Sequence, residues 1–241
     1  MKYILVTGAS GDIGEACVTQ LAKNGYSIYC HYFKNEKRVT QLINKLSEEY
    51  PKQDFFALQA DLTKPSEVSQ ITDNLFQLNG LVFAHGQTVY QLLTETTDEE
   101  LMMLWNSHVH SPIRICQLCQ SKLVTHDSSQ IIFISSVYGL IGSSMEVMYS
   151  TVKGAQLAFV KAYAKEVASM NLTVNAIAPG AVDTQMNTSW TQDEKRELLL
   201  DIPLNRMAKP SEIASLVNYL LSADATYITG TTIPLAGGWS I

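Results

Sequence analysis

Three residue types in one stretch of the sequence could together move a proton to or from a carbonyl oxygen. Tyr149 and Lys153 are four residues apart in YSTVK, and in a helix this spacing places both side chains on one face. A free tyrosine titrates at about 10, so a neighbouring ammonium would allow its phenol to act as an acid or base near neutral pH. Ser136 comes thirteen residues before Tyr149, where Ser135 and Ser136 follow the apolar run IIFI, and its hydroxyl could polarise a carbonyl. The three residues indicate carbonyl chemistry.

A glycine-rich segment, TGASGDIG from Thr7 to Gly14, follows the apolar run YILV and precedes a stretch that can form a helix. Glycines allow a sharp turn and a close approach to a pyrophosphate, and the amides and dipole of a helix start attract that anion. A glycine-rich turn without a ligand looks the same in sequence. Asp12 places a negative charge in this segment, and we expect it to cap the helix at the amide of Glu15 or Ala16, away from the phosphate.

The end of the second apolar run bears on which dinucleotide the loop would hold. An NAD site usually has Asp or Glu there, whereas this chain reads CHYFKNEKR, with no acid before Glu36. Lys34, Lys37 and Arg38 are close enough to meet a 2′-phosphate, or they form a solvated helix start. The pattern favours NADPH over NADH.

The third apolar run ends in QADLT, where an acidic residue again follows a predicted strand. Asp61 could accept a hydrogen bond from an adenine amino group. It could equally cap the next helix together with Thr63. Both interpretations stay open at this point.

These residues stand at the ends of apolar runs that alternate with stretches of helical period. The runs are YILV, YSIYC, FFALQ, LVFA, IIFI, LTVNAIA and TIPLA, and the helical stretches are 14–24, 36–49, 66–75, 98–124, 149–169 and 191–221. Continuously apolar strands are buried on both faces, as in a parallel sheet covered by helices. We therefore expect one α/β domain over residues 1–241, a Rossmann-type doubly wound sheet of about seven parallel strands with helices on both faces.

Composition narrows the class of protein. The formal net charge is −6, so no basic field is present to collect nucleic acid or anionic lipid. The apolar runs are far shorter than the roughly 20 residues of a membrane-spanning helix, and a strand-like run directly after Met1 leaves no room for a signal peptide. We expect a cytoplasmic protein that binds neither nucleic acid nor membrane.

Four cysteines occur in the chain, and two of them, Cys116 and Cys119, form CQLC. Because no second pair exists and the spacing places both on one face of an apolar helix, we expect a packing role and no metal. Metal or redox use of this pair is the alternative interpretation.

Over essentially its whole length the chain resembles the short-chain dehydrogenase/reductase superfamily, and within it the 3-oxoacyl-acyl-carrier-protein reductase-like group. The matching segments are the TGxxx loop, Asp61, Ser136, YSTVK, VNAIAPGAVDT, RMAKPSEIA, and YITG followed by Gly237 and Gly238. In detail, YSTVKGAQLAFVKAYAKE, APGAVDT and the terminal GGW are similar to bacterial reductases of 5-aminopentanone-modified elongation factor P.

The resemblance implies roles for these residues. Tyr149 would give a proton to the carbonyl oxygen while hydride arrives from the nicotinamide, Lys153 would bind the nicotinamide ribose and lower the phenol pKa, and Ser136 would orient the carbonyl. The cofactor site would comprise Gly8, Ser10, Gly11, Asp12, Ile13, Gly14, Tyr32, Lys34, Asp61, Leu62, Gly86, Tyr149, Lys153, Pro179, Gly180, Val182 and Thr184. A mobile substrate lid at about 185–205 and a homotetramer or homodimer are also implied.

Three departures from the family pattern bear on function. FAHG replaces Asn-Asn-Ala-Gly, so only Gly86 is kept. The family's catalytic Asn falls on His108, as an alternative proton-relay or helix-shaping group; the other interpretation is that Asn106, or neither residue, acts. Asp127 and Met170 stand where basic residues would meet an acidic acyl carrier protein, which lowers that carrier as the partner.

We therefore expect an NADPH-dependent carbonyl reductase that turns a ketone into a secondary alcohol. Its substrate is a carbonyl compound that is small or carried by another protein. The alternatives are an elongation factor P 5-aminopentanone reductase and a non-catalytic NADP(H)-binding regulatory protein.

Overall fold

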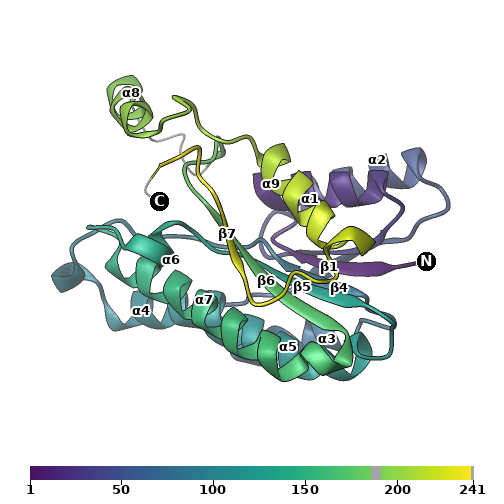
Figure 1. Cartoon of the computed structure of the whole chain (residues 1–241). Helices are drawn as coiled ribbons and strands as arrows, with labels where there is room; N and C mark the ends of the chain where they lie inside the picture. The colour runs from purple at the N-terminus through teal and green to yellow at the C-terminus, as the bar shows by residue number, and fades with distance from the viewer. Residues whose placement is uncertain (186–190, 240–241) are drawn as a thin grey trace.

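A computed structural model describes residues 1–185 and 191–239 and has a seven-stranded parallel sheet at its centre (Figure 1). The strands are β1 (Tyr3–Thr7), β2 (Ser27–Tyr32), β3 (Phe55–Gln59), β4 (Gly80–Phe83), β5 (Ser129–Ile134), β6 (Leu172–Pro179) and β7 (Thr232–Leu235). Their order is β3-β2-β1-β4-β5-β6-β7, and each neighbouring pair is parallel. The predicted doubly wound sheet is confirmed.

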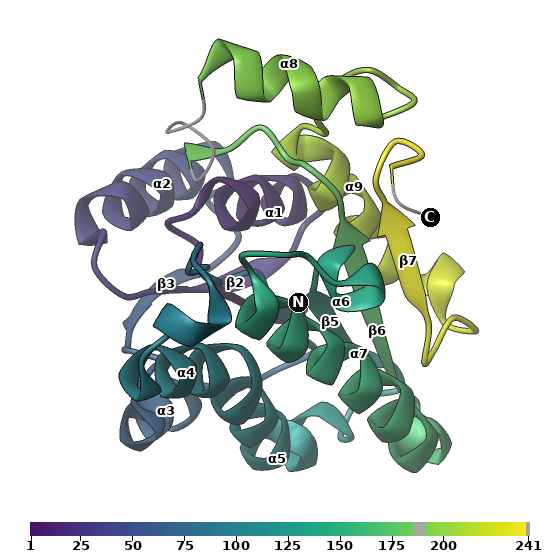
Figure 2. The same ribbon diagram turned by 90° about the vertical axis from the view of Figure 1, so that its left-hand side faces the viewer.

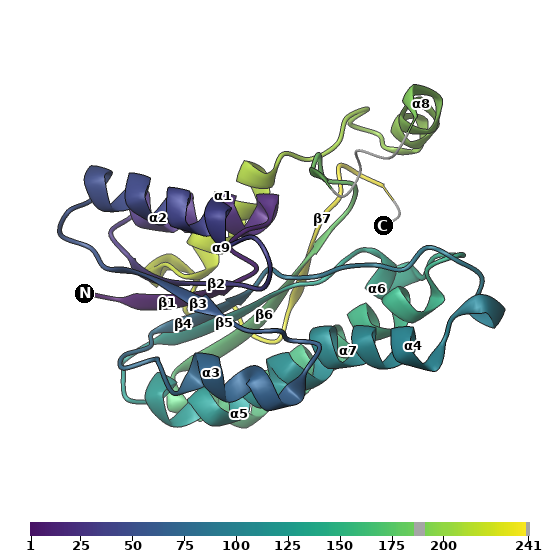
Figure 3. The same ribbon diagram turned by 180° about the vertical axis from the view of Figure 1, so that it is seen from behind.

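Helices cover both faces of this sheet. The α-helices are α1 (Asp12–Lys23), α2 (Glu36–Glu49), α3 (Val68–Thr72), α4 (Asp98–Trp105), α5 (Ser111–Leu123), α6 (Tyr138–Ile141), α7 (Val147–Val167), α8 (Gln192–Asp201) and α9 (Pro210–Leu220). A π-helical turn, η3 (Asn106–His110), joins α4 to α5. The short 3₁₀ helices are η1 (Pro65–Glu67), η2 (Leu93–Glu95), η4 (Ala168–Met170) and η6 (Ala223–Ala225). α1, α2 and α9 lie on one face and α3, α5 and α7 on the other (Figures 1 and 3).

The alternation of side chains along β1 explains why its sequence is continuously apolar. Ile4 and Val6 pack with residues of α1, α2 and α9, whereas Leu5 packs with residues of α3, α5 and α7. All three are at most 1% exposed. The strand is buried on both faces, as its sequence indicated.

The strand order reverses between β1 and β4, because the chain builds the sheet outward from β1 in one direction and from β4 in the other. In open α/β sheets ligands bind beyond the carboxyl ends of the strands at such a switch point. Figure 2 looks onto that edge of the sheet, with α6 and the start of α7 on one side and α8 on the other.

The stretch of helical period over 191–221 forms two helices, α8 and α9, separated by residues 202–209. Pro203 explains the break, because the residue before a proline is disfavoured in helical geometry, and Ile202 is extended with φ −97° and ψ 112°. Pro210 then starts α9, a position where its missing N–H is not needed.

None of the helices within 1–185 and 191–239 combines the length and the apolar character that crossing a bilayer requires.

Candidate active site

Ser136, Tyr149 and Lys153 meet where β5 ends against α7. The Lys153 Nζ donates to the carbonyl of Ile134, the last residue of β5, at 2.9 Å, and it lies 5.5 Å from the centre of the Tyr149 ring. Ser135 Oγ donates to the Lys153 carbonyl at 3.1 Å, which ties the strand end to the helix. The structure thus brings together the three residues that the sequence singled out for carbonyl chemistry.

A glycine makes this close packing possible. A Cβ on Gly139 would lie 2.8 Å from the Lys153 carbonyl carbon, nearer than carbon atoms can approach without movement. The turn that begins at Ser136 therefore rests directly on the α7 backbone. A side chain at this position would push Ser136 away from Lys153.

The surroundings of Tyr149 and Lys153 favour their neutral forms. Burial lowers the pKa of Lys153 to about 7. Desolvation raises the pKa of the Tyr149 phenol, Glu146 adds to that shift, and the Ser136 hydroxyl opposes it. Tyr149 is therefore protonated at neutral pH and is in the form that can give a proton.

His108 lies beside Tyr149, on the π-helical turn between α4 and α5. The sequence explains the turn, because Pro112 has no N–H to donate to the His108 carbonyl, and Ser111 N instead reaches back five residues to Asn106 O. The buried Gln156 of α7 fills the gap by donating its Nε2 to His108 O at 2.7 Å.

The hydrogen bonds of His108 favour one tautomer. Its Nε2 lies 2.9 Å from the Gln87 carbonyl oxygen, which only accepts, and 3.4 Å from the Gln87 amide nitrogen, which only donates. The shorter contact places the hydrogen on Nε2. Nδ1 is then an acceptor, and it has no partner within the described chain; the same holds for Gln156 Oε1. Asn106 is engaged elsewhere, since its Nδ2 donates to Thr63 O at 3.0 Å. Of the two candidates, only His108 makes a ring contact with Tyr149.

The phosphate loop at the end of β1 depends on two glycines. Gly8 has a φ of 72°, and a Cβ on Gly14 would lie 2.1 Å from the Gly8 carbonyl oxygen. No other residue type fits at Gly14, because the first turn of α1 rests on the loop itself. Gly11, the N-cap residue of α1, provides no side-chain cap, so the first amides of the helix keep the geometry that anions bind.

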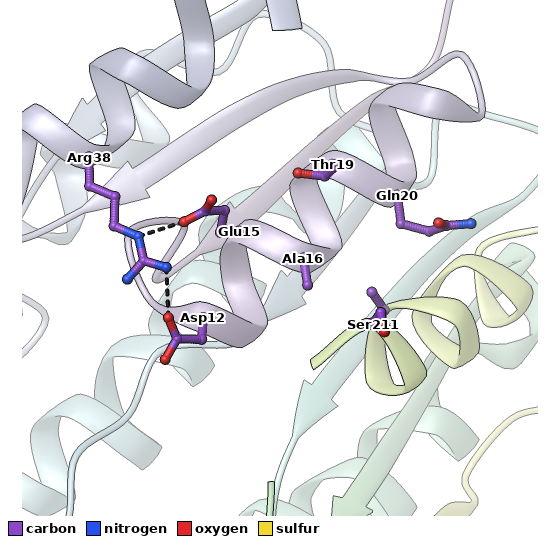
Figure 4. A pocket seen from close by; sticks show the side chains of 8 residues that line it. Asp12, Glu15, Ala16, Thr19, Gln20, Arg38 and Ser211 are labelled. Atoms are coloured by element: carbon purple, nitrogen blue, oxygen red, sulfur yellow. Dashed lines mark hydrogen bonds and ion pairs between the residues drawn. The ribbon is translucent and has the colours of Figure 1, made fainter. Parts of the chain in front are cut away.

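The expectation that Asp12 caps α1 was wrong. The Glu15 amide bonds to the Gly11 carbonyl, while the Asp12 carboxylate points outward (Figure 4). Asp12 Oδ1 pairs with Arg38 Nη2 at 2.6 Å, and Asp12 Oδ2 accepts from the Gln185 amide at 2.6 Å. A charged partner on α2 attracts the carboxylate more strongly than an uncharged amide does, and no local pattern in the chain indicates this pairing.

The other predicted cofactor residues surround this loop. Tyr32, at the end of β2, is buried, and the Lys34 Nζ lies 5.0 Å from the centre of the Phe33 ring. Asp61 Oδ1 accepts from Thr63 N at 3.0 Å and Thr63 Oγ1 at 2.7 Å. This is a local turn and not the helix cap that was one interpretation of Asp61, because the N-cap of η1 is Lys64 and it has no side-chain cap bond. Further predicted cofactor residues follow the carboxyl ends of three strands. Ser10 and Ile13 come after β1, Leu62 after β3 and Gly86 after β4.

The segment after β6 begins beside β7. The Gly180 amide donates to Leu235 O at 3.0 Å, and Val182 is buried in a bridge to Ala208. Pro179 is the last residue of β6, and Thr184 lies two residues beyond Val182. Of the predicted lid at 185–205, residues 186–190 lie outside the described residues, and the remainder includes α8.

Sequence reasoning missed two histidines that flank the phosphate loop. His31 Nδ1 accepts from the Gly8 amide at 3.2 Å, and its Nε2 bonds to Ala60 O. His85 Nδ1 bonds to Thr7 Oγ1 at 2.6 Å, and its Nε2 bonds to a backbone carbonyl. Desolvation lowers their pKa values to about 4 and about 3, respectively. The available signal was a polar residue inside or directly after an apolar strand at the carboxyl edge.

Within the described residues, no group of three or more His, Cys, Asp and Glu side chains could hold a metal ion. Cys116 and Cys119 are buried thiols whose pKa values are raised by desolvation, to about 12 for Cys119. Both pack in the hydrophobic core under the sheet.

Known proteins are similar to this chain in sequence and in fold. Residues 8–240 match the family described as Enoyl-(Acyl carrier protein) reductase. The chain is 38% identical to the "uncharacterized oxidoreductase YmfI" of Bacillus subtilis, over 99% of this chain and 98% of that protein. It is 31% identical to the 3-oxoacyl-[acyl-carrier-protein] reductase FabG of Staphylococcus aureus, over 98% and 97%. The crystal structure of a blue fluorescent protein from a metagenomic library, in complex with NADPH, matches with a TM-score of 0.93 at 28% identity, over 100% and 98%.

Proposed function

The chain belongs to the short-chain dehydrogenase/reductase superfamily as an NAD(P)H-dependent oxidoreductase, and we propose that it is an NADPH-dependent reductase that converts a ketone into a secondary alcohol. The observation that carries this proposal is the contact of Lys153 with the ring of Tyr149, whose phenol is protonated at neutral pH. A protonated phenol supplies the proton that a reduced carbonyl oxygen requires.

The residues present fit a dinucleotide. The loop has no space for a side chain at Gly8 or Gly14, and the uncapped start of α1 offers amides to a pyrophosphate. Lys34, after β2, carries a charge that suits a 2′-phosphate, and a solved relative was crystallised with NADPH. When bound, the cofactor supplies the hydride.

The chain's own residues then handle the proton. Tyr149 Oη gives its hydrogen to the carbonyl oxygen as that oxygen becomes an alcohol. With a pKa of about 7, Lys153 is partly an ammonium at neutral pH, and this form favours the phenolate that remains. Ser136 Oγ accepts from the Tyr138 amide at 3.1 Å, so the serine keeps its own hydrogen for the carbonyl oxygen. Together these groups orient and protonate the substrate.

We assign His108 to the proton-relay side of this site. Its unpaired Nδ1 can hold a hydrogen-bond donor, either a water or the Lys153 ammonium, next to Tyr149. The pKa of His108 lies well below its ordinary value, because of desolvation and then the nearby Lys153, so the ring stays neutral and keeps that lone pair. A water that donates one hydrogen to Nδ1 can give its other hydrogen to the Tyr149 phenolate, and solvent then replaces that proton.

The substrate is proposed to be a ketone that is small or attached to a protein. An acyl carrier protein is the substrate that the name of the FabG relative suggests. Asp127 and Met170 disfavour it, because they leave two uncharged or acidic positions where an acidic carrier needs cations. A ketone-modified elongation factor P, to which the YSTVK helix pointed, is the second candidate. We also propose a homotetramer or homodimer, which light scattering would measure.

One assay separates these possibilities. NADPH oxidation would be followed with acetoacetyl carrier protein, ketone-modified elongation factor P and a small β-ketoester, side by side and at matched concentration. Turnover with any of them supports the reductase, and the highest kcat/KM names the substrate class. NADPH binding without turnover of any ketone would instead favour the non-catalytic regulatory protein.

A further inference from the structure

A cation on α2 holds two carboxylates of α1 at the phosphate loop (Figure 4). The Arg38 Nη2 lies 2.6 Å from Asp12 Oδ1, and the Arg38 Nε lies 2.5 Å from Glu15 Oε2. The three side chains are only partly exposed, at 26% for Arg38, 19% for Asp12 and 36% for Glu15. The pairs are therefore less screened than fully exposed ones, and they fix α2 against the start of α1.

The cluster lies where a dinucleotide would place negative charge. Asp12 is the first residue of α1, and its neighbours Gly11 and Ile13 belong to the loop whose amides would face a pyrophosphate. Two carboxylates and one guanidinium leave one net negative charge. Without Arg38 there would be two, both within the first turn of the helix that must attract the anion.

The orientation of Asp12 is fixed from a second side. Its Oδ2 accepts from the Gln185 amide at 2.6 Å, at the end of the segment that follows β6. With one oxygen on Arg38 and the other on Gln185, the carboxylate is held outward rather than over the loop amides. The arrangement keeps the helix start open for another anion.

Arg38 could alternatively be read as a ligand for a 2′-phosphate, together with Lys34. The geometry disfavours this role in the observed state, because Nε and Nη2 are bonded to carboxylates and a phosphate at the remaining Nη1 would lie beside both of these negative charges. A 2′-phosphate that took Nε or Nη2 would displace Glu15 or Asp12, and the displaced carboxylate would then face the phosphates without its neutralising cation.

We infer that Arg38 is a positioning residue of the phosphate loop, which neutralises Asp12 and so permits the pyrophosphate of NADPH and NADH alike to bind. The inference rests on the proposed function as a dinucleotide-dependent reductase. Its signature is that the effect of Arg38 depends on Asp12 and is independent of the 2′-phosphate.

A double-mutant cycle tests this dependence. The affinities of NADP⁺ and NAD⁺ would be measured by isothermal titration calorimetry for the wild type, Arg38→Gln, Asp12→Asn and the double variant. Arg38→Gln is expected to weaken both dinucleotides by about tenfold, the order expected of one partly screened charge near a phosphate. The double variant is expected to return to within about threefold of the wild type, because Asn keeps an oxygen for Gln185 without the charge.

Two further variants keep the test independent of folding. Arg38→Lys retains the charge and should bind both dinucleotides nearly as the wild type does, whereas Lys45→Gln removes a cation from an exposed position of the same helix and should change nothing. Circular dichroism would check each fold. Raising the salt concentration should reduce the difference in dinucleotide affinity between Arg38→Gln and the wild type.

Distinct results would overturn the inference. A loss confined to NADP⁺ would make Arg38 a 2′-phosphate ligand, and a double variant as weak as Arg38→Gln would show that Asp12 is not what Arg38 acts on. Either result leaves the reductase proposal standing. A wild-type protein that binds neither dinucleotide would remove the proposed function and this inference with it.

Discussion

The imidazole of His108 stands perpendicular to the phenol ring of Tyr149, with the ring centres 5.6 Å apart and an angle of 87° between the planes. Two features of the chain produce this contact. Pro112 opens the helix into a π-helical turn, and a Cβ on Gly86 would lie 2.9 Å from the His108 Cε1, so glycine leaves room for the imidazole. The position of His108 is therefore built by the backbone on both sides of it.

Replacement of His108 tests whether this contact serves turnover. His108→Leu is expected to lower kcat by about a hundredfold, the lower end of what a proton-transfer group contributes, with the Kd of NADPH unchanged. His108→Asn, which offers a polar oxygen at the residue type usual in the family, should recover most of the loss. Steady-state kinetics over a range of pH would give both values. Equal activity of the Leu and Asn variants would leave His108 with a packing role only.

Burial of Lys153 predicts a pH-dependent cost to stability. Its pKa is about 7 in the folded protein, against 10.5 for an ordinary lysine, so between these values the unfolded chain binds the proton and the folded chain does not. Stability from this group then rises with pH across the window. At pH values below this window, Lys153→Met should have a free energy of unfolding at least about 1 kcal/mol higher than that of the wild type. This difference should shrink as the pH increases.

Urea unfolding of both proteins at a series of pH values measures that difference. Taking the difference cancels the other groups that titrate in the same window, including Tyr149 and the buried cysteines. If the difference in the free energy of unfolding stayed constant with pH, Lys153 would keep its ordinary pKa in the folded protein. Lys153→Met should also lose turnover, because no ammonium remains beside Tyr149.

The elements that could be predicted from the sequence are those whose signal is local. Apolar runs located the strands, and the spacing of Tyr149 and Lys153 placed them correctly on one helix face. Contacts between distant segments could not be predicted in the same way. The pairing of Asp12 with Arg38, 26 residues away, depends on how α2 packs beside α1, and no pattern within either segment encodes it.

The two flanking histidines illustrate the same limit. His31 and His85 lie in or directly after apolar strands, where a polar residue is noticeable, but their role follows only from the strand order. Because β2 and β4 both adjoin β1, the two imidazoles reach Gly8 and Thr7 from opposite sides. The break at Pro203, by contrast, has a local cause, since proline disfavours a continuous helix.

The phosphate loop predicts a sharp contrast between two glycines. Gly14→Ala places a methyl group 2.1 Å from the Gly8 carbonyl oxygen, so the loop must open and the affinity for NADPH should fall by at least about a hundredfold. Gly154→Ala on α7 meets its nearest atom at 3.4 Å, an ordinary contact, and should stabilise the helix by about 0.5–1 kcal/mol.

Fluorescence titration with NADPH and thermal unfolding would measure both glycine variants. The expected pattern is lost binding for Gly14→Ala and retained binding with a higher Tm for Gly154→Ala. Retained affinity in Gly14→Ala would show that the amides of the loop do not form the dinucleotide site.

Removal of the Tyr149 hydroxyl gives the most direct test of the proposed chemistry. Tyr149→Phe keeps the ring that packs against His108 and Lys153 but has no proton to give, so kcat for ketone reduction should fall by about a thousandfold or more. NADPH should bind as tightly as before, because the phosphate loop is unchanged. Tyr219→Phe, at an exposed position on α9, removes the same atom as a control and should retain full turnover. Comparable turnover in Tyr149→Phe and the wild type would exclude this phenol as the proton donor, and Ser136 would then be the next hydroxyl to replace.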